Sequence, residues 1–180
     1  AYVGTSTVTY GELEKAVDCY INTLYALGIR KGDRVGLYTA NCAEFVYVYM
    51  GVTSLGAIIV PINNSLVDRE VDYILKDAGA KLLVSDTPLT VSCDFIELSR
   101  LNEKAFSENA PAAPDVSGEL SEDDVCALVY TSGTTGNPKG AMLTHKNQIR
   151  NVEQYVQLVP VDEHSRILCV LPMFHCYCLT

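Results

Sequence analysis

The sequence has 180 residues, of which 48% are apolar, and its formal net charge is −9. The length suits one domain or a large part of one, and the apolar share is that of a globular protein rather than a disordered one. So acidic a chain lacks the basic surface that nucleic-acid binding requires, which excludes that class of partner. A polyanionic ligand must therefore be bound locally, by backbone amides and a few placed cations.

Seven cysteines occur at irregular spacing. No pair has the spacing of a structural zinc site, since Cys176 and Cys178 are separated by a single residue. We interpret them as thiols of a reducing compartment and expect a cytoplasmic protein. The chain begins at Ala1 with neither an initiator Met nor a signal peptide, so we expect its start to be trimmed.

The first predicted elements are a helix and a strand. Thr9 followed by Glu12 has the pattern of a capping box, in which each residue bonds the backbone of the other. Apolar residues then recur at helical spacing as far as Leu27, and Gly28 stands where a helix would end. The following apolar run, Arg34–Thr39, is typical of a strand.

The next segment resembles a membrane span in composition. Asn41 with Glu44 repeats the capping pattern and predicts a second helix that runs to about Leu55. Residues 45–62 carry no charge and are just long enough to raise the question of a span. Glycines, hydroxyl residues and a proline interrupt them, so we predict a buried helix followed by a buried strand at Ile58–Ile62, and no transmembrane segment.

A third helix is predicted at Val67–Ala78, ending at Gly79, and a short strand at Lys81–Ser85. Strands separated by helices of this length form parallel β-α-β units, whose sheet is covered on both faces. The fold class we predict is therefore α/β, an open and mostly parallel sheet flanked by helices.

Residues 87–124 differ from what precedes them. Three prolines punctuate this segment, its end is acidic, and it offers at most one short strand, near Asp94–Leu98. We predict a surface connection and a subdomain boundary here. The chain is thus divided into a helix-strand repeat (1–86), an irregular connection (87–124) and a third part (125–180), all within one domain.

A loop rich in glycine and hydroxyl residues follows the apolar strand Val125–Tyr130. Its sequence is Thr-Ser-Gly-Thr-Thr-Gly-Asn-Pro-Lys-Gly over Thr131–Gly140, after which apolar residues resume and Thr144 can cap a helix that runs to about Leu158. Three glycines allow the backbone to approach a ligand closely, and four hydroxyls can donate to phosphate oxygens. Lys139 adds a compact positive charge. We predict a phosphate-binding loop between two strands.

The loop does not have the Walker A pattern. That motif places its lysine directly before Ser or Thr at the start of a helix. Here Pro138 precedes Lys139, Gly140 follows it, and a second apolar segment comes before the helix. A Walker-type ATPase is therefore rejected.

The string from Tyr130 to Gly140 resembles the phosphate loop of the adenylate-forming (AMP-binding) superfamily, which includes acyl–CoA synthetases, peptide-synthetase adenylation domains and luciferases. The strings around Thr9–Leu13, Gly28–Val35 and Gly56–Asn63 are similar to the family's opening segment. Leu171–His175 is similar to its next motif.

This resemblance implies an acyl–CoA ligase that uses ATP, Mg²⁺ and CoA to convert a small carboxylic acid into acyl-AMP and then a thioester. It implies contacts with the ATP β- and γ-phosphates from the loop. It gives catalytic roles to Lys139 and Thr131, with Thr131 also near Mg²⁺. The implied phosphate-binding residues are Thr131, Ser132, Gly133, Thr134, Thr135, Gly136 and Lys139.

The second motif implies a substrate site. It follows a predicted strand at Ile167–Val170, which Pro172 ends. By resemblance, His175 borders the acyl pocket, and Tyr177 matches a tyrosine that contacts the substrate in 4-coumarate–CoA ligases. Fatty-acyl ligases have a similar string, so aromatic and aliphatic acids both stay open.

The family's later acidic residue for Mg²⁺, its ribose-binding aspartate and its C-terminal catalytic lysine have no counterpart in the sequence. We therefore expect an incomplete N-terminal large domain, inactive as a ligase by itself, that self-associates through exposed apolar faces. Two alternatives stay open. One is a non-enzymatic or only weakly nucleotide-binding α/β fragment, and the other is the adenylation domain of a peptide-synthetase-like branch.

Overall fold

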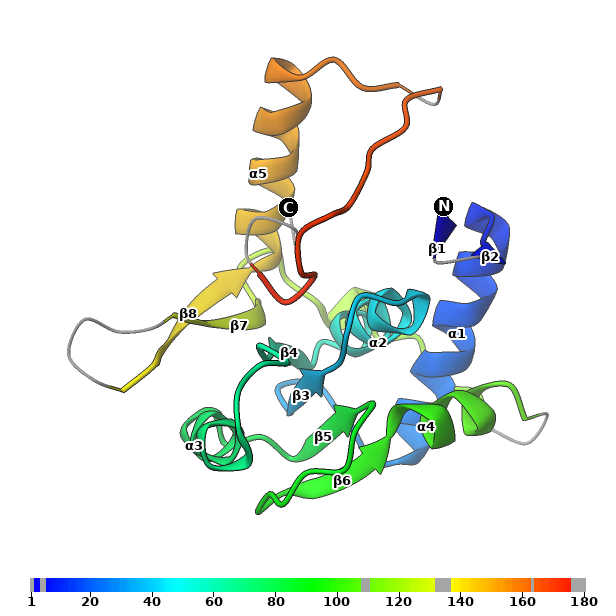
Figure 1. The fold of residues 1–180 in the computed structure, drawn as a ribbon. Coiled ribbons are helices and arrows are strands. Elements are labelled where there is room, and N and C mark those ends of the chain that lie inside the picture. The colour runs from blue at the N-terminus through cyan, green and yellow to red at the C-terminus, as the bar shows by residue number, and fades with distance from the viewer. Residues whose placement is uncertain (1, 4–5, 108–110, 132–136, 163, 176–180) are drawn as a thin grey trace.

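The structure, a computed structural model, describes residues 2–3, 6–107, 111–131, 137–162 and 164–175. Its main feature is a six-stranded sheet with helices on both faces, in the strand order β6-β5-β3-β4-β7-β8 (Figure 1). Only β7 and β8 pair antiparallel in this sheet, so the predicted open and mostly parallel α/β sheet is confirmed. In chain order the elements are β1 (Tyr2–Val3), β2 (Ser6–Thr7), α1 (Tyr10–Ala26), β3 (Arg34–Tyr38), α2 (Ala43–Ser54), β4 (Ile58–Pro61), α3 (Asp68–Ala78), β5 (Leu82–Ser85), β6 (Asp94–Glu97), α4 (Leu98–Ala105), a 3₁₀ turn (Ser117–Glu119), β7 (Val125–Thr131), β8 (Lys139–Thr144) and α5 (His145–Leu158).

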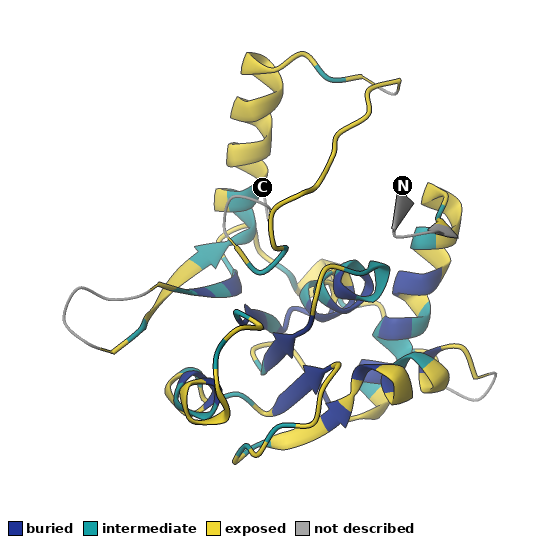
Figure 2. Cartoon of the chain, in the orientation of Figure 1, coloured by how far each residue is buried: buried dark blue, intermediate teal, exposed yellow. Residues whose placement is uncertain are grey.

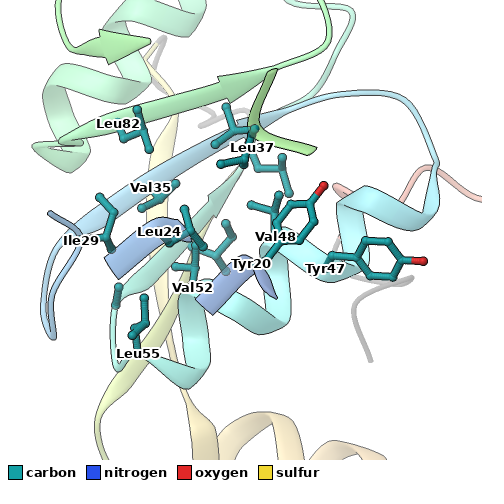
Figure 3. Close-up of a cluster of buried hydrophobic side chains, with 14 of the residues drawn as sticks. Tyr20, Leu24, Ile29, Val35, Leu37, Tyr47, Val48, Val52, Leu55 and Leu82 are labelled. Atoms are coloured by element: carbon teal, nitrogen blue, oxygen red, sulfur yellow. The ribbon is translucent and has the colours of Figure 1, made fainter. Parts of the chain in front are cut away.

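The two faces of the sheet are covered because successive side chains of a strand point to opposite sides. Val35 and Leu37 of β3 join the core cluster formed with α1 and α2, in which Tyr20 and Leu24 are fully buried (Figure 3). Leu83 of β5 belongs to the second cluster, which contains the buried side of α3. Figure 2 shows the buried residues concentrated in the strands and in the helix faces turned toward them.

Two of the predicted helix ends are confirmed. The hydroxyl of Thr9 accepts from the Glu12 backbone N–H at 3.2 Å, and the Glu12 carboxylate accepts from the Thr9 N–H at 2.7 Å. Gly79 ends α3 in the left-handed conformation, with φ of 61°, which glycine adopts without the steric cost of a side chain. The uncharged residues 45–62 divide into α2 and β4 as expected, and none of the helices in the described ranges is long and apolar enough to cross a bilayer.

The capping box predicted from Asn41 and Glu44 is wrong. The N-cap of α2 is Cys42, and it makes no side-chain capping bond. This start places Asn41 outside the helix, where its amide bonds the backbone of Leu171 and Met173 instead. A distant segment has therefore taken the polar group that the local pattern assigned to the helix.

The segment after β5 is more ordered than the predicted connection. It supplies β6 to the sheet edge, followed without a break by α4, which the sequence analysis did not predict. Leu98, Leu101 and Ala105 are buried against the core cluster that includes α1. Their spacing is helical, but no glycine or proline separates the helix from β6, so the pattern lacked a start signal.

The connection between parallel β5 and β6 is unusually short. Residues 86–93 join the two strands without a helix, whereas such crossovers usually need a dozen residues or more. The backbone N–H groups of Thr90 and Ser92 donate to Asp68 and Asp72 of α3, at 2.9 and 2.8 Å. The loop thus lies against α3, whose carboxylates accept hydrogen bonds from loop N–H groups. In a crossover helix, such N–H groups would be paired within the helix itself.

The strand predicted at Ile167–Val170 is also wrong. These residues have no regular structure, and the side chains of Ile167, Leu168 and Val170 are 71, 82 and 72% exposed. A strand is stabilised by pairing its backbone groups with a neighbour. No described strand pairs with this segment, so its apolar composition alone does not fix an extended conformation.

We predict that Gly36→Ala lowers the free energy of unfolding by about 1–3 kcal/mol, as overpacked core positions do. A Cβ at Gly36 in the central strand β3 would lie 2.5 Å from Cδ2 of Leu75 and 3.1 Å from Cδ1 of Leu83, both of which are buried. Urea unfolding of the two proteins measures the difference. Gly11→Ala is the control, because a Cβ there meets nothing within 4 Å; an equal loss in both variants would contradict the packing argument.

Candidate functional site

The candidate site lies at the carboxyl edge of the sheet, defined here as the ends of β3, β4, β5 and β7. Parallel pairing of β3 with β4 and β5, and of β4 with β7, brings these four ends to one edge. Ligands of open α/β sheets bind outside the carboxyl ends of the strands. The predicted phosphate loop leaves the sheet at this edge, directly after Thr131.

The loop joins two antiparallel strands, as the sequence predicted. Thr131 at the end of β7 pairs with Lys139 at the start of β8, and Tyr130 pairs with Gly140. The predicted loop residues between them, Ser132, Gly133, Thr134, Thr135 and Gly136, lie outside the described residues. Their roles stay predictions.

Tyr130 fastens the base of this hairpin. Its ring lies over Gly140, where a Cβ would come within 3.0 Å of the ring carbons, so a side chain larger than glycine would displace the ring. Its hydroxyl donates to Oδ2 of Asp77 at 2.6 Å, which ties β7 to α3. Burial, followed by the hydrogen bond and the negative charge of Asp77, raises the pKa of Tyr130. The phenol therefore stays protonated and able to donate at neutral pH.

Sequence reasoning missed the role of Asp77. The residue is separated by 53 positions from Tyr130, and its place in the last turn of an amphipathic helix carries no sign of a polar partner. Only the packing of α3 against the sheet brings the two together.

The two described residues of the loop ends are open to a ligand. The side chains of Thr131 and Lys139 are exposed, and Lys139 forms no ion pair within the described part of the chain. An unneutralised ammonium and a hydroxyl are thus held opposite each other by the strand register. This pair can bind an anion that enters between the strand ends.

The second motif returns to the same edge from a distance. After α5 the chain runs outside the sheet and comes back toward it (Figure 1). Asn41, which follows β3, bonds the backbone at Leu171 and Met173, while Met173 and Phe174 pack against the main core cluster. The His175 N–H donates to the Pro172 carbonyl at 3.0 Å and closes a turn.

The structure therefore places His175 in an exposed turn attached to the edge where the predicted phosphate loop begins. Tyr177, the other predicted substrate residue, lies outside the described residues. Across the described ranges, no group of three or more His, Cys, Asp or Glu side chains is arranged to hold a metal ion.

An open α/β sheet with a hydroxyl- and glycine-rich sequence between two antiparallel strands at its carboxyl edge is typical of nucleotide-binding proteins. The family model described as AMP-binding enzyme matches residues 1–180. The chain belongs to the AMP-binding enzyme family.

Individual relatives agree with this assignment. The chain is 37% identical to the long-chain-fatty-acid–CoA ligase FadD13 of Mycobacterium tuberculosis, covering 100% of this chain and 39% of the ligase. It is 34% identical to 4-coumarate–CoA ligase 3 of Arabidopsis thaliana, covering 95% of this chain and 34% of that enzyme. The chain thus spans well under half the length of these curated relatives.

Solved structures share the fold. The N-terminal domain of FACL13 from M. tuberculosis, bound to an inhibitor, has a TM-score of 0.86 and 35% identity, covering 96% of this chain and 46% of the other. The Bacillus subtilis O-succinylbenzoate coenzyme A synthetase MenE, in complex with AMP, has a TM-score of 0.88 and 30% identity, covering 98% and 46%.

We predict that Tyr130→Phe lowers the free energy of unfolding by about 1 kcal/mol at pH 7, the usual net worth of a lost hydrogen bond. The pKa of Tyr130 is raised in the folded state. The stabilisation from its hydroxyl is therefore complete below the pKa of an unfolded tyrosine, about 10, and decreases as the pH rises from there toward the folded-state pKa. Urea unfolding at pH 7 and at about pH 10.5 measures this. A difference from wild type that stays constant with pH would contradict the assignment, and Tyr10→Phe, at an 85% exposed side chain, is the control.

Proposed function

We propose that residues 1–180 form the ATP-phosphate-binding part of an acyl–CoA ligase, which converts a carboxylic acid into acyl-AMP and transfers the acyl group to CoA. The observation that carries the proposal is the exposed Thr131–Lys139 pair at the loop ends, on the carboxyl edge of the sheet. The relatives named above are CoA ligases, which favours this branch of the family over peptide-synthetase-like adenylation.

The loop would act on the phosphates of ATP. As pyrophosphate leaves, negative charge grows on the β- and γ-phosphate oxygens, and donors already aimed at that position stabilise the transition state. Lys139 would supply the charge, and the loop hydroxyls and amides would supply hydrogen bonds. Tyr130, tied to Asp77 and packed on Gly140, would keep the two loop ends in register.

Mg²⁺ would suit the hydroxyl-rich sequence of the loop. This ion is usually held by a few protein oxygens together with phosphate oxygens and water, so the Thr131 hydroxyl suits it as one ligand. Bound there, the ion would neutralise phosphate charge. The residues of this chain would bind and orient the triphosphate.

The substrate side of the site would be the turn that ends at His175, with Tyr177 close behind it in sequence. Because this turn is fastened at the same edge as the phosphate loop, a carboxylate near His175 could face the α-phosphate of an ATP held by the loop. The relatives named act on long-chain fatty acids and on 4-coumarate, so the acid class is left open here too.

A cytoplasmic location is part of the proposal. It is supported by Cys19, Cys42, Cys93 and Cys126, which are thiols rather than disulfides. Unpaired cysteines are the rule in reducing compartments.

We predict that Lys139→Ala slows acyl-adenylate formation about 100- to 1,000-fold in the full-length ligase, a cost of about 2–4 kcal/mol for one lost transition-state contact. Thioester formation from a preformed acyl-adenylate should be almost unchanged, because no phosphate leaves in that step. Lys139→Arg should restore only part of the rate, since a planar guanidinium does not replace a point charge. ATP–pyrophosphate exchange and single-turnover thioester formation measure the two steps.

The 180-residue chain alone serves as the negative control in both assays. A less than twofold effect of Lys139→Ala on both steps would mean a solvated lysine without a role. Equal losses in both steps would indicate a function in folding or domain closure, and the assignment to the leaving phosphates would be wrong.

We also propose that the 180-residue chain self-associates through the apolar side of α5 and the segment after it. No residue of α5 is buried, and Ile149, Leu158 and Leu168 are 56, 83 and 82% exposed (Figure 2). Exposed apolar surface of this kind promotes association in water.

Sedimentation velocity should therefore give a weight-average mass that rises with concentration. Ile149→Glu combined with Leu168→Glu should shift it toward 19.6 kDa. A wild-type chain that stays monomeric and binds no hydrophobic dye would contradict this prediction.

A further inference from the structure

Asn41 makes a two-pronged contact with the substrate-side motif. Its Nδ2 donates to the Leu171 carbonyl at 2.8 Å, and its Oδ1 accepts from the Met173 N–H at 2.7 Å. The two bonds enclose Pro172, which has no N–H of its own to offer. One side chain thus fixes the backbone on both sides of the proline, across 130 positions of sequence.

The segment that leads to this contact has little structure to guide it. From Val159 to Val170 the described residues form no helix or strand, and most of their side chains are exposed. Met173 and Phe174 do pack against the core, but apolar packing is non-directional. Hydrogen bonds of defined geometry set the position of the backbone more narrowly.

Asn41 is itself attached to a rigid part of the sheet. Oδ2 of Asp86, directly after β5, accepts from the Thr39 hydroxyl at 2.8 Å and from the Ala40 N–H at 3.0 Å. These bonds join the ends of β3 and β5 immediately before Asn41. The asparagine therefore projects from a fixed point of the carboxyl edge.

On the far side of the contact lies the turn with His175. The His175 N–H donates to the Pro172 carbonyl, so the residues that Asn41 holds are the first half of the same turn. A displacement at Leu171 or Met173 would move His175 relative to the sheet edge and the phosphate loop.

We propose that Asn41 is a positioning residue for the substrate-side turn Leu171–His175, acting through its two bonds to the backbone; this rests on the proposed ligase function. Asparagine suits the task because its amide offers a donor and an acceptor side by side. An aspartate has the same shape but would turn a carboxylate oxygen toward the Leu171 carbonyl, losing one bond and adding repulsion.

Hydrogen exchange in the 180-residue chain tests the contact without any turnover. In Asn41→Ala, the Met173 amide should exchange roughly five- to tenfold faster, the effect of losing one hydrogen bond. The matched control is Asn22→Ala, because Oδ1 of Asn22 also accepts a distant backbone N–H, that of Ala113 at 2.8 Å, in another part of the fold. It should leave Met173 exchange unchanged. Equal exchange at Met173 in wild type and Asn41→Ala would overturn the proposal.

Kinetics of the full-length ligase test the consequence. With dodecanoate and 4-coumarate as probe acids, Asn41→Ala should raise KM for the acid about five- to tenfold and KM for ATP less than about twofold. Asn41→Asp keeps the size and one bond, so it serves if the alanine variant does not fold, and it should shift KM in the same direction. An enzyme whose acid KM is unaltered in both variants, or whose two KM values rise together, would overturn the positioning role. A wild-type enzyme that exchanges pyrophosphate with no carboxylic acid tested would count against the ligase function alone, since the hydrogen-exchange result stands independently of it.

Discussion

The parallel alignment of β3, β4, β5 and β7 is the constraint on which the site depends. Parallel strands need covering on both faces, and α1, α2 and α4 on one side and α3 on the other supply it. Because the strands run in one direction, their carboxyl ends meet at a single edge. The predicted phosphate loop, the Asp86 contact and the Asn41 contact all begin there. Burial of the faces and assembly of the site are thus consequences of the same alignment.

The two halves of the candidate site reach this edge by different means. The phosphate loop comes with its own hairpin, whose register is set by strand pairing and by the packing of Tyr130 on Gly140. The substrate-side turn arrives after a long irregular segment and is held by a side chain of another element. Strand pairing therefore places the two ends of the loop, whereas the turn depends on a contact with a distant side chain.

Exposed apolar surface gathers on one part of the molecule. The β7–β8 hairpin and α5 project from the rest of the fold, and α5 buries none of its residues (Figure 1). The solved N-terminal domain of FACL13 contains this arrangement within a chain about twice as long, of which the present residues match 46%. The fold described here thus carries its own core for the parallel sheet and little of one for α5.

The sequence by itself determined the features that act over a few residues. The capping box at Thr9, the end of the third helix at Gly79 and the strand–loop–strand pattern around Thr131–Gly140 depend on contacts between near neighbours, and all three were predicted correctly. The alternation of helices and strands also predicted the parallel sheet, because a helix between two strands allows them to run in the same direction. The family resemblance of the loop and of the opening strings likewise lay in contiguous residues.

Tertiary structure alone decided the rest. Asn41 was assigned to a helix cap because its local pattern allowed it, but a segment 130 residues away offered better partners. Asp77 gave no sign of its bond to Tyr130, and the apolar residues 167–170 formed no strand because no described strand lies beside them. The bonds of Asn41 and Asp77 join residues far apart in sequence, and such contacts exist only after the sheet has brought the partners together. The same dependence on distant partners explains residues 167–170, where no described strand is present to pair with.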